Sequence, residues 1–191
     1  MKTTDYIAYT VDRLPKGYVF TYDDFYNGVN NKEAIIKALN RMAVSGKIEK
    51  LSKGKYYKAE KTIFGNLEPP QKQIVKDLLE DNGKIIGYLT GLSIYNQLGF
   101  TTQVSNTIQI GKNEVRPQLE RGRYFISFVK QKNTITKENI YAMQLFDVLR
   151  FIDKIPDTTI ENTLTRFIEL LKKMEAKEIS NLQRLALKYT P

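Results

Sequence analysis

The chain has 191 residues, of which 41% are hydrophobic, so it is long enough for one large domain or two small ones. It contains no cysteine and no histidine, which excludes disulfides, thiol chemistry, imidazole catalysis and the usual zinc sites. Its formal net charge of +9 favours an anionic partner. No apolar run approaches the roughly 18 residues of a membrane helix, and no signal peptide is visible. We therefore expect a cytoplasmic protein without a membrane partner.

The first predicted elements lie between residues 19 and 58. Val19-Phe20 is a short apolar strand, and residues 21–24 have the capping-box pattern that begins a short helix. After a turn rich in Gly and Asn, a second helix is expected over residues 32–45. Two strands follow, at 48–51 and 56–58, joined by a tight turn. This order predicts a winged helix-turn-helix, a DNA-binding fold, over residues 1–62.

The second helix of this domain has two different sides. Its apolar positions share one side and are expected to pack on the core, which leaves a polar side exposed. Between residues 32 and 58 there are eight Lys or Arg residues and only two acids. Amide and guanidinium groups read base edges, while lysine mostly contacts phosphate. The predicted DNA-binding residues are Asn31, Lys32, Lys37, Asn40, Arg41, Lys53 and Lys55. The alternative is an ordinary charged surface around a small helical core.

A second domain is expected after a break near residues 60–68, and we assign it residues 63–191. Pro69-Pro70 begins its first helix. The expected helices cover residues 70–80, 91–98, 137–154, a segment capped by Thr158, and 178–189; the expected strands cover 85–87, 104–110 and 124–129. The fold class is therefore α+β, with an N-terminal winged helix-turn-helix followed by a mixed α/β domain that ends in helices.

A group of cations lies in the middle of this second domain. Six Lys or Arg residues occur between positions 112 and 132, against two acids. Arg116, Arg121 and Arg123 are the expected partner-binding residues, because the planar guanidinium bonds two oxygens at once. The group fits an acidic protein surface or nucleic acid. It also fits a solvated sheet edge guarded by charge.

Catalysis has little support in the sequence. Only carboxylates are available to hold a metal ion, and no Gly-rich phosphate loop of a known type occurs. Glu175-Ala176-Lys177 resembles part of a nuclease site, but it falls in a helical region. We expect no enzyme activity, no catalytic residue, no cofactor and no metal site.

Two segments of the second domain resemble a known family. Gly87-Tyr88-Leu89-Thr90-Gly91-Leu92-Ser93 and Leu98-Gly99-Phe100-Thr101-Thr102-Gln103-Val104-Ser105-Asn106 resemble the central signature of AbiEi-like antitoxins, in a branch catalogued as a domain of unknown function. Residues 17–21 through 54–57 resemble the winged helix of that family, so the resemblance covers nearly the whole chain. It implies an antitoxin of an abortive-infection (phage defence) system. Such a protein represses its own operon by binding double-stranded DNA at its promoter, and its C-terminal domain neutralises a nucleotidyltransferase-like toxin.

Two interpretations remain after the sequence analysis. The first is a DNA-binding antitoxin and transcriptional autorepressor of a toxin–antitoxin operon. The second is a protein-interaction adaptor or transcription regulator whose winged helix serves a partner other than its own operator. Salt-dependent binding to duplex DNA separates them.

Overall fold

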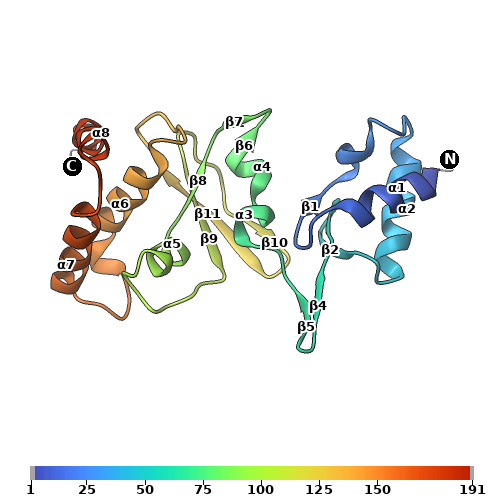
Figure 1. Ribbon diagram of the computed structural model, residues 1–191, viewed down its shortest axis with the longest axis horizontal. Coiled ribbons are helices and arrows are strands. Elements are labelled where there is room, and N and C mark those ends of the chain that lie inside the picture. The colour runs from blue at the N-terminus through green and yellow to red at the C-terminus, as the bar shows by residue number, and fades with distance from the viewer. Residues whose placement is uncertain (1–2, 190–191) are drawn as a thin grey trace. The chain divides into compact units, whose positions relative to one another are not determined.

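The computed structural model describes residues 3–189 and divides into two compact units, between Val75 and Lys76 (Figure 1). Both units contain helices and sheets, so the protein is α+β. The division lies later than the boundary expected near residues 60–68. Two residues that were assigned to the second domain, residues 63–191, bond to the first: the Asn66 amide donates to Glu49, and the Gln73 side chain accepts from the Val19 backbone.

The first unit is built from short elements around one core. In chain order they are α1 (Thr3–Arg13), β1 (Val19–Phe20), the 3-10 helix η1 (Tyr22–Phe25), α2 (Lys32–Val44), β2 (Glu49–Ser52), β3 (Lys55–Tyr57), β4 (Glu60–Thr62), β5 (Gly65–Leu67) and α3 (Gln71–Ile74). An antiparallel sheet has the order β1-β3-β2, and β4 pairs with β5 alone. The elements predicted over residues 19–58 are confirmed, with bounds that shift by about one residue. Helix α1 and the β4–β5 hairpin were not predicted.

The core of the first unit joins α1, η1, α2 and the sheet. Its buried side chains are Ile7, Val11, Phe20, Phe25, Ile35, Ala38, Leu39, Met42, Ile48 and Tyr56. The capping box at η1 is confirmed, because Thr21 accepts from the Asp23 backbone and Asp24 accepts from the Thr21 backbone. Local capping and a shared core therefore fix the relative positions of these short elements.

The second unit combines a mixed sheet with a helical end. Its elements are α4 (Lys76–Leu79), β6 (Glu80–Asp81), β7 (Lys84–Ile85), β8 (Tyr88–Thr90), α5 (Leu92–Gln97), β9 (Thr107–Lys112), β10 (Leu119–Arg121), β11 (Tyr124–Lys130), α6 (Ile140–Arg150), η2 (Ile152–Lys154), α7 (Ile160–Leu171) and α8 (Ala176–Ala186). The main sheet has the order β10-β11-β9-β8, with β9 and β11 parallel. Helices α6, α7 and α8 form the helical end that the sequence predicts (Figure 1).

Three expectations for the second domain were wrong in detail. The strand expected over residues 85–87 does not form, since β7 ends at Ile85 and β8 begins at Tyr88. The helix expected over residues 70–80 is two short helices, α3 and α4, separated at Val75. Helix α7 is capped by Thr159, whose hydroxyl accepts from the Asn162 backbone at 3.1 Å, and not by Thr158.

Helix α7 carries apolar residues at helical spacing that are only partly buried. Ile160, Leu164 and Ile168 remain about half exposed, because the helix turns Thr163, Phe167 and Leu170 toward the interior instead. Helical spacing indicates correctly that α7 is amphipathic. It does not locate the middle of the buried face, because Thr163 is polar and yet buried.

A buried carboxylate joins α6 to the sheet of the second unit. The Tyr88 hydroxyl donates to Asp147 Oδ2 at 2.7 Å, and the Thr90 hydroxyl donates to the same oxygen at 2.8 Å. Gln131 Nε2 donates to the Tyr88 hydroxyl at 2.9 Å. Burial raises the pKa of the Asp147 carboxyl, although the hydrogen bonds from Tyr88 and Thr90 act in the opposite direction. The folded protein therefore binds a proton at Asp147 more readily than the unfolded chain does.

This carboxylate predicts a pH-dependent stability. As pH rises from the ordinary pKa of aspartate through the raised folded value, ionisation of Asp147 costs the folded state about 1.4 kcal/mol for each unit by which the pKa is raised. The Asp147→Asn variant, which cannot ionise, is expected to lack this loss. Denaturant unfolding of both proteins across this pH range measures it. A difference in unfolding free energy that stays constant with pH contradicts the prediction.

Candidate functional site

Helix α2 presents a defined face because its other face is buried. Asn31 caps the helix, its side-chain oxygen accepting from the Ala34 backbone at 3.0 Å, and Gly46 takes a positive φ of 70° after the last turn. The buried stripe is Ile35, Ala38, Leu39 and Met42, as predicted. Of the expected DNA-binding residues, Asn31 thus has a structural function at the start of the helix.

The exposed face of α2 carries Lys37, Asn40, Arg41 and Val44. Lys37 and Arg41 are four residues apart, so they are neighbours on the helix surface. Neither forms a hydrogen bond or ion pair with the part of the chain that the structure describes. Val44 is 91% exposed at the end of the same face. The two cations can bind anionic groups on the outside of a ligand, and the exposed apolar side chain can contact flat, partly apolar groups that lie between those anionic groups.

Asn40 is held by the neighbouring strand. The hydroxyl of Tyr56 on β3 donates to Asn40 Oδ1 at 2.7 Å, and Tyr56 is itself buried. Burial raises the pKa of the Tyr56 hydroxyl, which remains a donor at neutral pH. Because Oδ1 already accepts this bond, the amide nitrogen of Asn40 is the group best placed to donate to a ligand. The bond also ties the exposed face of α2 to the sheet.

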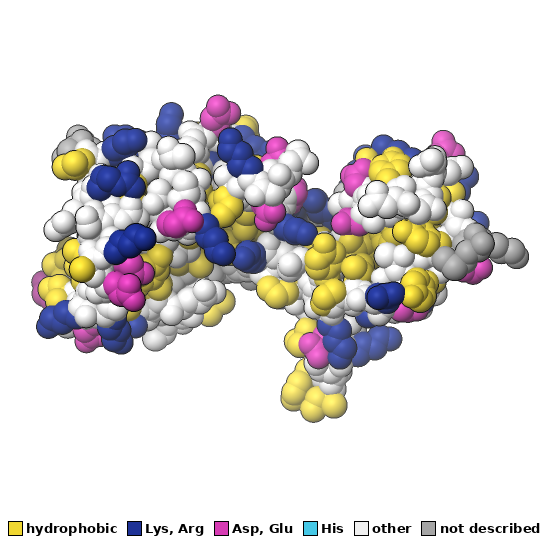
Figure 2. All heavy atoms as spheres, turned by 45° about the horizontal axis from the view of Figure 1, so that its top comes forward, with side chains coloured by type: hydrophobic (Ala, Val, Ile, Leu, Met, Phe, Trp, Pro, Cys, Tyr) yellow, Lys and Arg dark blue, Asp and Glu magenta, His cyan; other side chains and the backbone are white. Residues whose placement is uncertain are grey.

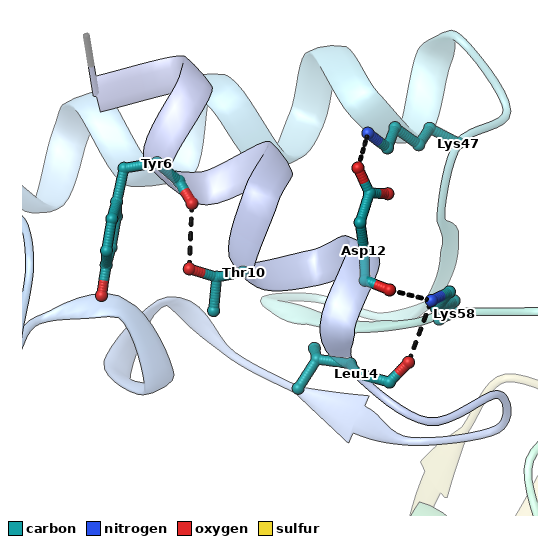
Figure 3. A network of polar contacts seen from close by, with 6 residues as sticks. All are labelled: Tyr6, Thr10, Asp12, Leu14, Lys47 and Lys58. Carbon is teal, nitrogen blue, oxygen red and sulfur yellow. Dashed lines mark hydrogen bonds and ion pairs between the residues drawn. The ribbon is translucent and has the colours of Figure 1, made fainter. Parts of the chain in front are cut away.

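Some of the cations counted in the sequence hold the first unit together (Figure 3). Lys47 Nζ pairs with Asp12 Oδ2 at 2.9 Å. Lys58 Nζ donates to the backbone oxygens of Asp12 and Leu14 at 2.6 and 3.0 Å, at the C-terminal end of α1. The carbonyl groups at a helix C-terminus attract cations. Lys47 and Lys58 therefore act on α1, which the sequence analysis did not predict.

Lys32 is held in a different way at the start of α2. Its ammonium nitrogen lies 4.4 Å from the centre of the Tyr22 ring. A hydrogen bond with Tyr22 raises the pKa of Lys32, which stays fully charged near neutral pH. The contact links η1 to α2 and keeps this cation at the surface.

The β2–β3 hairpin carries the remaining predicted residues. Gly54, with φ of 73°, makes the turn, and Lys53 precedes it as an exposed side chain without a partner in residues 3–189. Lys55 begins β3 and is half-buried. The tip of this hairpin therefore presents Lys53 more openly than Lys55.

The three arginines expected to bind a partner do not form one surface. Arg121 is 7% exposed, and its guanidinium makes two hydrogen bonds to the Asp77 carboxylate, at 2.5 and 2.7 Å. This forked pair, in which Arg121 is buried and Asp77 is half exposed, joins β10 to α4. Arg121 therefore has a structural function, and its assignment to the partner-binding residues is corrected. The pairing was invisible in the sequence because Asp77 is distant along the chain.

Arg116 and Arg123 are exposed and lie over aromatic rings of β11. Arg116 is 5.2 Å from the centre of the Phe128 ring, and Arg123 is 5.3 Å from that of Tyr124. Alternate residues of a strand share a face, so the two rings lie on the same side of β11, about 13 Å apart along the strand. These two arginines remain candidates for partner binding.

Two other kinds of feature are absent from residues 3–189. No helix there is both long and apolar enough to cross a bilayer. No group of three or more acidic, histidine or cysteine side chains there is arranged to hold a metal ion.

Comparison with known proteins places the chain in a family. Residues 6–179 match the family described as a family of unknown function, DUF6088, so the match includes α2, the β2–β3 hairpin and most of the second unit. Searches of curated proteins and of solved structures found no match. Because the family match covers most of the sequence, the chain belongs to DUF6088.

Proposed function

We propose that the protein is a DNA-binding transcription regulator whose first unit is a winged helix-turn-helix. The observation that carries the proposal is the exposed face of α2, where Lys37 and Arg41 have no partner in the described residues. A helix, a strand, a short helix, a second long helix and a hairpin follow one another in the first unit, the order expected of this fold. In this arrangement α2 enters the major groove, and the β2–β3 hairpin contacts phosphates beside it.

We further propose that the protein regulates its own operon as an antitoxin. This part rests on the resemblance of residues 87–93 and 98–106 to AbiEi-like antitoxins. The second unit then neutralises a nucleotidyltransferase-like toxin, and we assign the contact to Arg116 and Arg123, two of its exposed cations. The competing adaptor function predicts binding to an acidic protein and no salt-dependent binding to duplex DNA.

The first prediction concerns reading of bases by α2. Arg41→Ala is expected to reduce the preference for DNA upstream of the gene over random duplex by about 1–3 kcal/mol, because a bidentate guanine contact is lost. Mobility-shift titration of both duplexes measures the ratio of the two affinities. Arg13→Ala, which changes an exposed arginine on α1, is the matched control. An unchanged ratio for Arg41→Ala removes this residue from base recognition.

Asn40 needs a paired test, because its side chain also bonds to Tyr56. Asn40→Ala and Tyr56→Phe both remove the 2.7 Å hydrogen bond, but only the first removes the amide. If Asn40 contacts bases, Asn40→Ala lowers the sequence preference and Tyr56→Phe preserves it. If both variants have the same preference for upstream over random DNA, and lose similar amounts of stability, Asn40 has a structural function only.

The second prediction concerns the hairpin. Lys53→Ala is expected to weaken binding to upstream and random DNA equally, and to flatten the slope of log affinity against log salt by about one unit. Changing Lys53 and Lys55 together flattens it by about two units. Lys47→Ala removes the same charge from a lysine paired with Asp12, so its slope is expected to change less. If Lys47→Ala and Lys53→Ala change the slope equally, the hairpin makes no specific phosphate contact.

The third prediction concerns the second unit. When the protein is co-expressed with the product of the neighbouring gene, the Arg116→Ala, Arg123→Ala double variant is expected to lose rescue of growth while it retains binding to DNA. Arg41→Ala is expected to keep rescue when the toxin is expressed from an unrelated promoter. Arg184→Ala serves as the matched control on α8. Rescue that survives in the double variant refutes the contact through these two arginines.

A further inference from the structure

The β4–β5 hairpin exposes two large apolar side chains at its tip. Residues 62 and 65 are paired across the hairpin, so Ile63 and Phe64 alone form the loop. Ile63 is 93% exposed and Phe64 is 95% exposed, the highest values among the large hydrophobic side chains of residues 3–189. Figure 1 shows this hairpin projecting from its unit, and Figure 2 shows hydrophobic surface at the tip.

The fold does not need apolar side chains at this position. The loop is closed by polar contacts: the Thr62 hydroxyl donates to the Gly65 carbonyl oxygen at 2.8 Å and accepts from the Phe64 backbone at 3.2 Å. Gly65 supplies the positive φ, 109°, that completes the turn. Side chains that bury almost no area add almost nothing to stability. Serine at both positions would leave the hairpin intact, so the apolar pair suits an occupant outside the unit.

The hairpin is anchored beside the sheet that packs on α2. Asn66 Nδ2 on β5 donates to Glu49 Oε1 on β2 at 2.7 Å, and Lys16 pairs with Glu60 on β4 at 3.2 Å. Because β2 is the edge strand of the β1-β3-β2 sheet, β4–β5 lies next to the β2–β3 hairpin. The first unit therefore carries two neighbouring hairpins, one with a lysine tip and one with an apolar tip.

The charges around the hairpin favour an anionic occupant over a neutral protein surface. The carboxylates of Glu60 and Glu49 are both engaged, by Lys16 and Asn66. Lys61, in the middle of β4, is exposed and has no partner in the part of the chain described. An apolar tip on a narrow stem with a lysine matches a groove between two rows of phosphates.

We propose that Ile63 and Phe64 are a wedge that enters the minor groove of the bound duplex and partly unstacks one base step. The inference rests on the proposed DNA binding and specifies a second contact for it. Apolar side chains inserted in this way bend the duplex, and pyrimidine–purine steps such as TA unstack most easily. The wedge therefore favours DNA with TA steps over a stiff A-tract, without reading bases through hydrogen bonds.

The test uses the absence of tryptophan from the sequence. Phe64→Trp in the full chain places a single indole at the tip, and stacking on a base quenches its fluorescence. The probes are alternating poly(dA-dT) duplex, which is rich in TA steps, and poly(dA)·poly(dT), which has none. Strong quenching by the alternating duplex and weak quenching by the homopolymer are expected. Val104→Trp, at a position that is 79% exposed in the second unit, is expected to respond little to either.

A binding measurement complements the fluorescence. The Ile63→Ser, Phe64→Ser double variant is expected to lose roughly tenfold in affinity for the alternating duplex, the size of one lost base–aromatic contact, with little change for the homopolymer. Val104→Ser with Leu187→Ser removes two exposed apolar side chains elsewhere and is expected to change neither affinity. Thermal unfolding of both double variants is expected to match that of the unchanged protein.

The outcomes separate the wedge from the proposed function. Binding to both duplexes without quenching of the Phe64→Trp variant overturns the wedge and leaves DNA binding standing. Quenching that follows protein concentration without DNA assigns the tip to a second copy of the chain, and quenching by the co-expressed partner protein assigns it to that partner. Either result overturns the wedge. If the unchanged protein binds no duplex at low salt, the proposed function and the wedge both fail.

Discussion

The rotation of α2 about its own axis is the constraint on which the first unit depends. Four apolar side chains pack into the core, and burial of each of the three large ones, Ile35, Leu39 and Met42, contributes about 1.5–3 kcal/mol. Turning the helix away from this position is therefore very costly. Since an α-helix has 3.6 residues per turn, burial of positions 35, 38, 39 and 42 leaves 37, 40, 41 and 44 on the outside. The same packing that stabilises this small unit therefore selects the side chains that it leaves exposed.

Lysine and arginine serve two different purposes in the first unit. Residues 1–62 carry 12 basic and 7 acidic groups, a net charge of +5. Only some of these cations are exposed without a partner within residues 3–189, while others hold parts of the unit together. Lys47 and Lys58 hold the end of α1, and Lys32 lies over an aromatic ring. Up to residue 62, the cations without a partner in the described residues lie on α2 and on the two hairpins; they are Lys37, Arg41, Lys50, Lys53 and Lys61. A count of cations in the sequence thus overstates the size of a surface that could bind an anion, because cations that already have a partner in the protein are included in the count.

The sequence predicted those features that are local in the chain. Capping at residues 21–24, the buried stripe of α2 and the β2–β3 turn depend on residues a few positions apart, and all are present. Helix α1 was missed because only Ile7 and Val11 are buried in it. The pairing of Arg121 with Asp77 and the bond from Tyr56 to Asn40 join distant segments, so no local pattern indicates them. The partly exposed stripe of α7 shows the same limit, since tertiary packing decides which side of an amphipathic helix is covered.

The bond between Tyr56 and Asn40 has a consequence for how the specificity of such a protein changes over time. Replacing Asn40 by a side chain that cannot accept a hydrogen bond leaves the Tyr56 hydroxyl without this partner, and the loss of one such hydrogen bond costs about 0.5–1.5 kcal/mol. Substitutions at positions 37 and 41 carry no such cost, because these side chains are exposed and unpaired within the described residues. Positions 37 and 41 are therefore freer to change than position 40, where a new side chain keeps this bond only if it also offers an acceptor to Tyr56.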